Sequence, residues 1–290
     1  MNPMDNEGFK HMFRSWELGL FAPSVSSLTP AQTISLAAAY RYHWLEWRVQ
    51  TAEALANSPW GPALNTLALE TLETDAPLVA AAARDAGLRT SGLQVDLPAD
   101  ELHWIPTVLD AARELDCSLV RIDVPRFDPA QGYLAQRDAF RQRLMAWAAQ
   151  AAGRGVRICI ENHFDTLAPS ASLVADLLRD FEPTHVGVMW DPANTVLEGS
   201  ERPELALDQI KAYLAEVHLK NGLWTMQQAG RWTFAWCCLD EGMVNWPAIL
   251  TLLEVAGYRG PLVVEDYRPL EPEVKLAEAR DYLRAVSEIL

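Results

Sequence analysis

Residues 157–194 read RICIENHFDTLAPSASLVADLLRDFEPTHVGVMWDPAN, and this stretch holds two short apolar runs on either side of a longer segment. The runs Arg157–Glu161 and Val186–Trp190 are mostly apolar, which is typical of parallel strands that are buried on both faces. Ser170 stands between them, where its hydroxyl can cap the first turn of a helix. The stretch therefore predicts a strand, a helix and a second, parallel strand.

The same alternation extends over the rest of the chain. Six further runs are predicted as strands: Trp16–Leu20, Trp44–Val49, Thr90–Gln94, Leu119–Val124, Glu216–Leu219 and Leu262–Glu265. Helix signals separate them: a capping box at Thr29–Pro30 with Gln32, helical runs at Leu78–Asp85, Leu134–Ala152 and Val274–Leu290, an opening proline at Pro203, and a run that Asn245 precedes and Gly257 closes.

Eight strands, each followed by a helix, predict an α/β fold, the (β/α)8 TIM barrel of parallel strands. An open, doubly wound sheet is the alternative. No GxGxxG motif follows any predicted strand, which removes the commonest ligand motif of that fold. The sequence has no glycine- or serine-rich linker, so we predict one domain over residues 1–290.

Charge and composition narrow the possible partners. With 24 basic and 39 acidic residues the formal net charge is −15, a field that repels phosphate backbones and argues against nucleic acid. No apolar run is long enough to span a bilayer, and residues 1–16 lack the pattern of a signal peptide. We therefore expect no membrane partner and a cytoplasmic location. The four cysteines form no CxxC pair, which predicts reduced packing thiols.

Four consecutive predicted strands end in a group that can bind a metal: Glu161, Asp191, His218 and Glu265. In a barrel, the functional groups lie at the carboxyl ends of the strands. One such acid often caps a helix or pairs with an arginine, but four in succession are hard to explain in that way. Three carboxylates and an imidazole suit one hard or borderline divalent ion, which would offset the cost of burying them.

The motifs ENH, WDPAN, HLKN and GPLVVED, in this order, resemble the xylose-isomerase-like TIM-barrel superfamily of sugar isomerases and epimerases, which includes the AP endonuclease 2-like family. Three further segments agree with the resemblance: WLEWR at 44–48, AGLRTSGL at 86–93 and LDEGMVNWPAIL at 239–250. The similarity therefore extends over nearly the whole chain.

The resemblance implies one divalent metal ion held by Glu161, Asp191, His218 and Glu265, with Mn²⁺ favoured over Mg²⁺, Co²⁺ and Zn²⁺. It also implies that Glu161 and Glu265 are catalytic. They would move protons on a small ketose or hydroxy-keto substrate through a cis-enediolate. Independently of the family, a proton beside a carbonyl is too weakly acidic for a free carboxylate, and a metal supplies the missing charge stabilisation.

Two departures weaken a ketohexose 3-epimerase assignment. Asn194 stands where the best-studied epimerases have a histidine that contacts substrate, and the arginine that follows their strand-seven histidine has no match here. The segment from Leu223 to Trp236 holds three tryptophans and could cover the site as a loop.

Five residues are candidates for substrate binding, and several have an alternative role: His163, Asn194, Lys220, Glu46 and Trp190. Lys220 could be a solvated lysine at a strand end, and His163 could instead hydrogen-bond a metal ligand. Glu46 could orient a ligand, or it could form a salt bridge with a barrel arginine such as Arg121.

Three alternative functions remain open at this point. An inosose or dehydroshikimate dehydratase would begin with the same proton abstraction. An apurinic endonuclease would need more histidine and acidic ligands and a basic surface, which the charge argues against. A non-catalytic barrel is the third alternative. Such a protein could lose the four ligands freely, so the presence of all four argues against it. Relatives are often homo-oligomers, which makes a homo-oligomer possible by analogy.

Overall fold

Eight parallel strands pair in a closed ring. The computed structural model describes residues 16–57, 63–97 and 102–289, and in it the barrel strands are β1 (Leu18–Phe21), β2 (Trp44–Gln50), β4 (Arg89–Asp96), β5 (Leu119–Ile122), β6 (Arg157–Glu161), β7 (Val186–Trp190), β8 (Leu214–Leu219) and β11 (Leu262–Val264). Neighbours in this order pair in parallel, and β1 pairs with both β2 and β11, which closes the sheet. The ring confirms the predicted TIM barrel and excludes the open sheet. A short strand, β3 (Leu67–Ala68), pairs with the end of β2.

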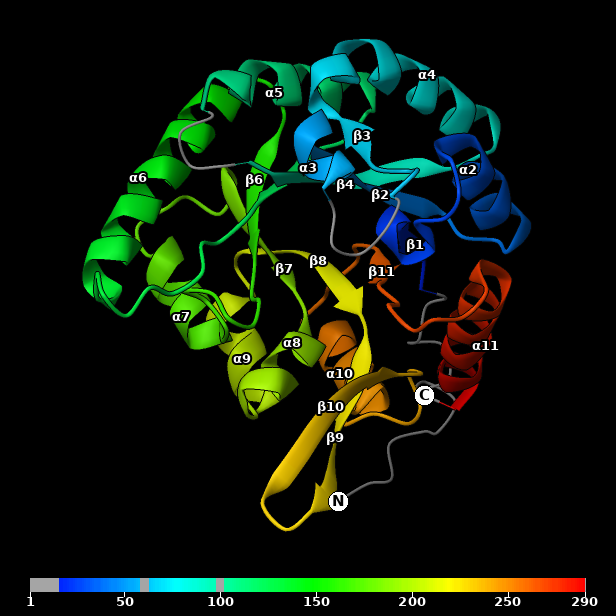
Figure 1. Ribbon diagram of the computed structural model, residues 1–290, viewed down its shortest axis with the longest axis vertical. Coiled ribbons are helices and arrows are strands. Elements are labelled where there is room, and N and C mark those ends of the chain that lie inside the picture. Colours follow the sequence, from blue (N-terminus) through cyan, green and yellow to red (C-terminus); the bar gives the residue numbers. More distant parts are fainter. Residues whose placement is uncertain (1–15, 58–62, 98–101, 290) are drawn as a thin grey trace, which may run out of the picture.

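Helices follow the strands and surround the barrel (Figure 1). They are α2 (Pro30–Ala39), α3 (Ala52–Ala56), α4 (Leu72–Asp85), α5 (Ile105–Glu114), α6 (Tyr133–Ala151), α7 (Ala171–Leu178), α8 (Pro192–Glu198), α9 (Pro203–Ile210), α10 (Trp246–Val255) and α11 (Pro272–Ile289). The predicted caps are present: Thr29 and Gln32 form the capping box of α2, and the side chains of Ser170 and Asn245 cap α7 and α10. Each cap satisfies a backbone N–H that the helix itself leaves without a partner.

Side chains alternate along each strand between the barrel interior and the surrounding helices. In β7, Val188 and Trp190 belong to the apolar core, which lies between the strands and the helices. Met189, between them in sequence, points inward and reaches Gly92 of β4. Asp191 is next in the inward series, so the alternation carries it into the barrel at the carboxyl end of β7.

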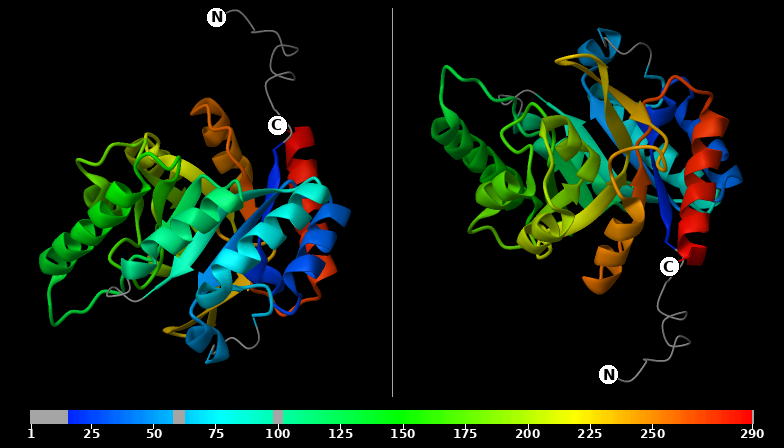
Figure 2. Two further views of the ribbon diagram at one scale, coloured as in Figure 1. Left: turned by 90° about the horizontal axis from the view of Figure 1, so that it is seen from above. Right: turned by 90° about the horizontal axis from the view of Figure 1, so that it is seen from below.

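A β-hairpin interrupts the pattern after β8. Its strands β9 (Asn221–Gln228) and β10 (Arg231–Cys237) pair antiparallel, and Gly230 adopts the positive φ of 77° that the tight turn requires. The segment Leu223 to Trp236, expected to be a loop, is therefore mostly strand. In both views of Figure 2, the hairpin and α3 lie at the same end of the barrel.

None of the helices in the described ranges is long and apolar enough to cross a bilayer. The expectation that residues 1–16 are not a signal peptide concerns a segment that lies, except for Trp16, outside the described residues.

Candidate metal centre

The four predicted ligands converge at the carboxyl ends of four neighbouring strands. Glu161 ends β6, Asp191 follows β7, His218 lies in β8 and Glu265 follows β11. One ligand atom from each lies within 4.8 Å of the ligand atoms of the other three. All four residues are buried, and the most exposed of them, Glu265, is 6% exposed. Parallel strands bring their carboxyl ends to the same edge, which is why residues so distant in sequence meet here.

Each of the three carboxylates has one oxygen held by the protein. Glu161 Oε2 pairs with the buried guanidinium of Arg121. Asp191 Oδ1 accepts hydrogen bonds from the first backbone N–H groups of α8, at 2.8 and 3.2 Å, and so acts as the cap of that helix. Glu265 Oε1 accepts a hydrogen bond of 2.5 Å from the Tyr267 hydroxyl. These contacts fix the orientation of all three carboxylates.

The second oxygens face a common centre. Glu161 Oε1 and Glu265 Oε2 lie 3.3 and 3.8 Å from Nδ1 of His218. Asp191 Oδ2 shares the ammonium of Lys220 with Glu265 Oε2. Among the described residues, neither Asp191 Oδ2 nor either ring nitrogen of His218 makes an aligned hydrogen bond. Buried polar atoms without partners are costly, and a cation bound among them would remove that cost. Three carboxylates and one imidazole therefore fit a divalent ion.

The electrostatics keep two of these carboxylates ionised. Burial alone would raise the pKa of Glu161, but Arg121 and the nearby histidines His218 and His163 together outweigh it and hold this pKa at about 2. The pKa of Glu265 lies well below its usual value, because Lys220 and His218 outweigh the effect of burial. Both glutamates are therefore carboxylates at neutral pH, the form in which an acid binds metal or removes a proton.

Lys220 is buried beside the ligands. Its side chain is 2% exposed, and Nζ lies 2.8 Å from Asp191 Oδ2 and 2.5 Å from Glu265 Oε2. The Trp236 ring of the hairpin lies over the ammonium, with its centroid 4.6 Å from Nζ. The reading of Lys220 as a solvated lysine is therefore wrong, because strand β8 continues its inward alternation to this residue. Its contact with substrate stays a prediction.

Asn194 and His163 stand beside Glu161. Asn194 is fully buried, and its Nδ2 donates to Glu161 Oε1 over 3.1 Å, so it helps to orient that ligand. His163 is half-buried at the edge of the site, where its ring stacks on Phe164 with centroids 4.3 Å apart. A role of either residue in substrate binding stays a prediction.

The other two candidates, Glu46 and Trp190, are fully buried. Glu46 is fully buried, 3.0 Å from Nε2 of His218. It does not pair with Arg121, which pairs with Glu161 and Asp123 instead. Trp190 is 1% exposed and packs in the apolar core, because the alternation of β7 turns it toward the helices. Other aromatic rings lie nearer the ligands: Trp236 of the hairpin covers Lys220, and the Tyr267 hydroxyl bonds Glu265.

A polar cluster that was not predicted from the sequence lies at the ends of β2, β4 and β5 and consists of Arg48, Gln94, Asp96, Arg121 and Asp123. Arg121 links this cluster to the metal centre through its pair with Glu161. The inward positions of these strands alternate with apolar ones, as in LQVD at 93–96 and RID at 121–123. That period of two is the signal that could have identified the cluster.

Asp123 gives this cluster a testable pH dependence. Burial, the nearby charge of Asp96 and a hydrogen bond with it raise the pKa of Asp123 to about 8. The folded protein thus keeps this proton between about pH 4 and pH 8, where the unfolded chain has lost it, so stability falls as pH rises through that window. We expect Asp123→Asn to remove this slope.

The carboxyl side chain of Asp123 is 40% exposed. Solvent screening therefore limits the effect. We expect the free energy of unfolding of Asp123→Asn to exceed that of the wild type by about 1 kcal/mol at pH 9, and this difference to fall toward zero near pH 4. Urea unfolding of the metal-free wild type and Asp123→Asn at pH 4, 6, 8 and 9 measures this difference. A stability difference that does not change with pH would contradict the prediction.

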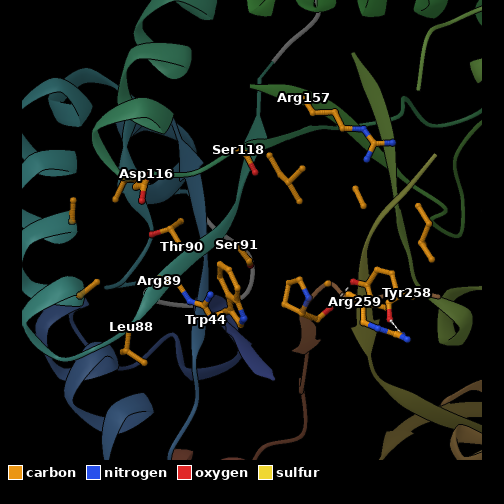
Figure 3. Close-up of a pocket in the computed structure, with 18 of the residues that line it drawn as sticks. Trp44, Leu88, Arg89, Thr90, Ser91, Asp116, Ser118, Arg157, Tyr258 and Arg259 are labelled. Carbon is orange, nitrogen blue, oxygen red and sulfur yellow. Dashed lines mark hydrogen bonds between the residues drawn. The ribbon is translucent and has the colours of Figure 1, made fainter. Parts of the chain in front are cut away.

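A cavity of about 620 Å³ lies at the opposite end of the barrel, where strands begin (Figure 3). Trp44, Arg89 and Arg157, the first residues of β2, β4 and β6, line it. Arg89 pairs with Glu17 at 2.6 Å and lies over the Trp44 ring, and Arg157 donates hydrogen bonds to two backbone carbonyls. These charges already have partners, so this cavity is a weaker candidate for the reaction than the metal centre.

Comparison with known proteins agrees with the fold. The family model described as xylose isomerase-like TIM barrel matches residues 57–286. A search of curated proteins gave no significant match. Among solved structures, a xylose isomerase-like TIM barrel protein from Mycobacterium smegmatis in complex with magnesium has a TM-score of 0.72 at 18% identity, with 96% of this chain and 97% of that chain covered.

Two further structures carry names that include an activity. A D-allulose 3-epimerase from Methylomonas sp. has a TM-score of 0.69 at 15% identity and covers 94% of this chain and 99% of its own. A probable 3-DHS dehydratase, AsbF, from Bacillus anthracis has a TM-score of 0.67 at 16% identity and covers 94% and 98%. At these identities the likeness shows the fold alone, whereas the family model matches most of the sequence itself. The chain therefore belongs to the xylose isomerase-like TIM barrel family.

Proposed function

We propose that this protein is a metal-dependent isomerase or epimerase of a small ketose or a related hydroxy-keto compound. The observation that carries the proposal is the placement of two ionised carboxylates, Glu161 and Glu265, around one buried centre. They come from β6 and β11, which are separated in the barrel by β7 and β8. Two carboxylates approaching one centre from different strands suit a reaction in which one group removes a proton and another returns it.

A divalent ion held by the four ligands would polarise the substrate carbonyl and stabilise negative charge on its oxygen. Glu161 and Glu265 would then exchange protons with the carbon next to the carbonyl. Lys220, whose ammonium lies 2.5 Å from Glu265 Oε2, would donate a hydrogen bond to a substrate oxygen. Mn²⁺ is the first ion to test, since oxygen ligands with one imidazole suit it, and Mg²⁺, Co²⁺ and Zn²⁺ follow.

Aromatic side chains around Lys220 favour a substrate with an apolar ring face or carbon chain. The Trp236 ring lies 6.5 Å from that of Tyr267 and 6.4 Å from that of Phe164, measured between centroids. Such rings bury the C–H face of a sugar while the polar groups bind its hydroxyls. The similarity to a D-allulose 3-epimerase is consistent with this class of substrate.

A dehydratase acting on an inosose or a dehydroshikimate-like compound is the second candidate. Lys220 favours it, because a buried ammonium beside the centre would hydrogen-bond to a departing hydroxyl and offset the charge on it, and the proton that a glutamate removed would leave with that hydroxyl as water. The first step is the same proton abstraction. The similarity to a probable 3-DHS dehydratase supports including that substrate class in any assay.

Incorporation of solvent deuterium tests both candidates together. The purified protein is stripped of metal with a chelator, reloaded with each of the four ions, and incubated in D2O with ketohexoses, ketopentoses, hydroxypyruvate, inosose or dehydroshikimate. We expect metal-dependent deuterium incorporation beside the carbonyl for one class, detected by NMR. The products then distinguish isomerisation, epimerisation and loss of water.

Two results would argue against the proposal. Metal-loaded protein that neither exchanges a proton with any of these compounds nor converts any of them would contradict proton-transfer chemistry. Robust metal-dependent nicking of apurinic DNA would support the endonuclease alternative instead, which the charge of −15 argues against.

A further inference from the structure

A pair of buried carboxylates lies beneath the metal centre, on the far side of the His218 ring. Glu46 Oε2 of β2 lies 3.0 Å from His218 Nε2, and Glu216 Oε1 of β8 lies 3.6 Å from the same atom. All three side chains are fully buried. Neither oxygen of Glu46 makes an aligned hydrogen bond with any residue in the described ranges. A carboxylate buried this deeply, with His218 as its nearest partner and no aligned hydrogen bond, is costly and therefore calls for a functional reason.

The two ring nitrogens of His218 face different groups. Nδ1 lies 3.3 Å from Glu161 Oε1 and 3.8 Å from Glu265 Oε2, on the side of the metal ligands. Nε2 faces Glu46 and Glu216. A neutral imidazole carries one proton and one lone pair, and only the lone pair can bind a metal. Binding through Nδ1 thus requires the proton on Nε2, where Glu46 is the nearest acceptor.

A glycine on the neighbouring strand leaves space for the two carboxylates. On β4, next to β2 in the barrel, a side chain at Gly92 would place its Cβ 3.3 Å from Glu46 Cγ and 3.7 Å from Glu216 Oε1. The absence of a side chain there leaves the interior to the two carboxylates. Arg121, the cation that could neutralise Glu46, is engaged by Glu161 and Asp123.

We propose that Glu46 is a positioning residue that accepts the Nε2–H of His218 and thereby presents Nδ1 to the metal, with Glu216 as a weaker second acceptor. The inference rests on the proposed metal centre. A carboxylate behind a ligating histidine fixes its tautomer and raises its basicity, and losing such a partner typically costs about 10–100-fold in metal affinity.

Glu46→Leu and Glu46→Gln test the proposal. We expect Glu46→Leu to raise the Kd for Mn²⁺ or Zn²⁺ by about 10–100-fold. The metal-free variant should also lose stability, because His218 loses its nearest carboxylate, so the Kd is the deciding measurement. Glu46→Gln should give an intermediate Kd, since its amide oxygen still accepts an N–H. A purely structural Glu46 would lower the melting temperature but leave the Kd unchanged.

The matched control is Glu254→Gln, which neutralises a buried carboxylate of α10 that pairs with Arg259. Its metal Kd should stay within about twofold of the wild type. The tautomer is read directly from two-bond ¹⁵N-histidine NMR spectra of the Zn²⁺-loaded proteins. The wild type should show one histidine protonated at Nε2, a signal that Glu46→Leu shifts or broadens.

The outcomes separate this inference from the proposed function. A wild type that binds no divalent ion defeats the metal centre itself. A wild type that binds metal, with an unchanged Kd and spectrum in both Glu46 variants, defeats only the positioning role. Binding of two ions per chain, reduced to one in Glu46→Gln, would also overturn it, because the lower carboxylates would then be ligands of a second ion.

Discussion

Glu161→Gln and Glu265→Gln are each expected to lower kcat by about 10³-fold, within the range that a positioned general base contributes and equal to about 4 kcal/mol of transition-state stabilisation. The amide keeps the shape and one ligating oxygen but cannot take up a proton. The pKa of Glu161 at about 2 and the lowered pKa of Glu265 mean that the wild type presents both as carboxylates at pH 7.

If one glutamate acts on each face of the substrate, the two variants should also differ in the face on which they still exchange protons. If the substrate is epimerised, each variant keeps one carboxylate, so deuterium should still enter slowly from one face while net epimerisation is lost. Asp266→Asn is the control, because Asp266 follows Glu265 directly but pairs with Arg268. An activity within tenfold of the wild type in either Gln variant, with metal bound, would exclude that glutamate as a base.

Much of the fold could be predicted because strands and caps are local signals. The predicted runs Arg157–Glu161 and Val186–Trp190 coincide with β6 and β7, and the cap residues Thr29, Ser170 and Asn245 begin their helices as expected. These features depend on neighbouring residues, so the sequence alone is enough to locate them.

Where tertiary packing decides, the sequence was less informative. Helix α4 was expected from Leu78 but begins at Leu72, with Pro77 inside it. Proline removes one backbone hydrogen bond, and this cost favoured a later start. The buried side chains of Leu72 and Ala76 continue the apolar face of the helix, and their burial outweighs the proline.

The convergence of the four candidate ligands could be predicted, whereas most of their supporting contacts could not. Glu161, Asp191, His218 and Glu265 end apolar strands, which is a signal in the sequence. The pairing of Arg121 with Glu161 depends on which inward residues face each other across the barrel, and that follows only from the closed register. EVHLK at 216–220 shows three polar residues with a period of two, a signal that places Glu216 on the same inward face as His218 and Lys220.

Lys220→Met is expected to have the second large effect, on stability. Lys220 is 2% exposed and neutralises Asp191 and Glu265, so its loss leaves two buried carboxylates without their cation in the metal-free protein. Breaking a buried ion pair typically costs about 3–5 kcal/mol. For a chain of this size, that lowers the melting temperature by roughly 10 °C.

Adding a divalent metal should restore part of the stability that Lys220→Met loses. In the wild type, the ammonium of Lys220 repels an ion bound to the same oxygens, whereas in Lys220→Met the ion replaces the missing positive charge. The variant should therefore bind Mn²⁺ more tightly than the wild type, and its melting temperature should rise more on adding metal. Lys275→Met is the matched control, since Lys275 is also buried but, within the described part of the chain, its ammonium donates to the backbone carbonyls of Ser24 and Asp266 and to no carboxylate. It should destabilise the protein without changing the metal-induced shift. An equal shift in wild type and Lys220→Met would mean that Lys220 and the ion do not share these carboxylates, which would place the metal elsewhere.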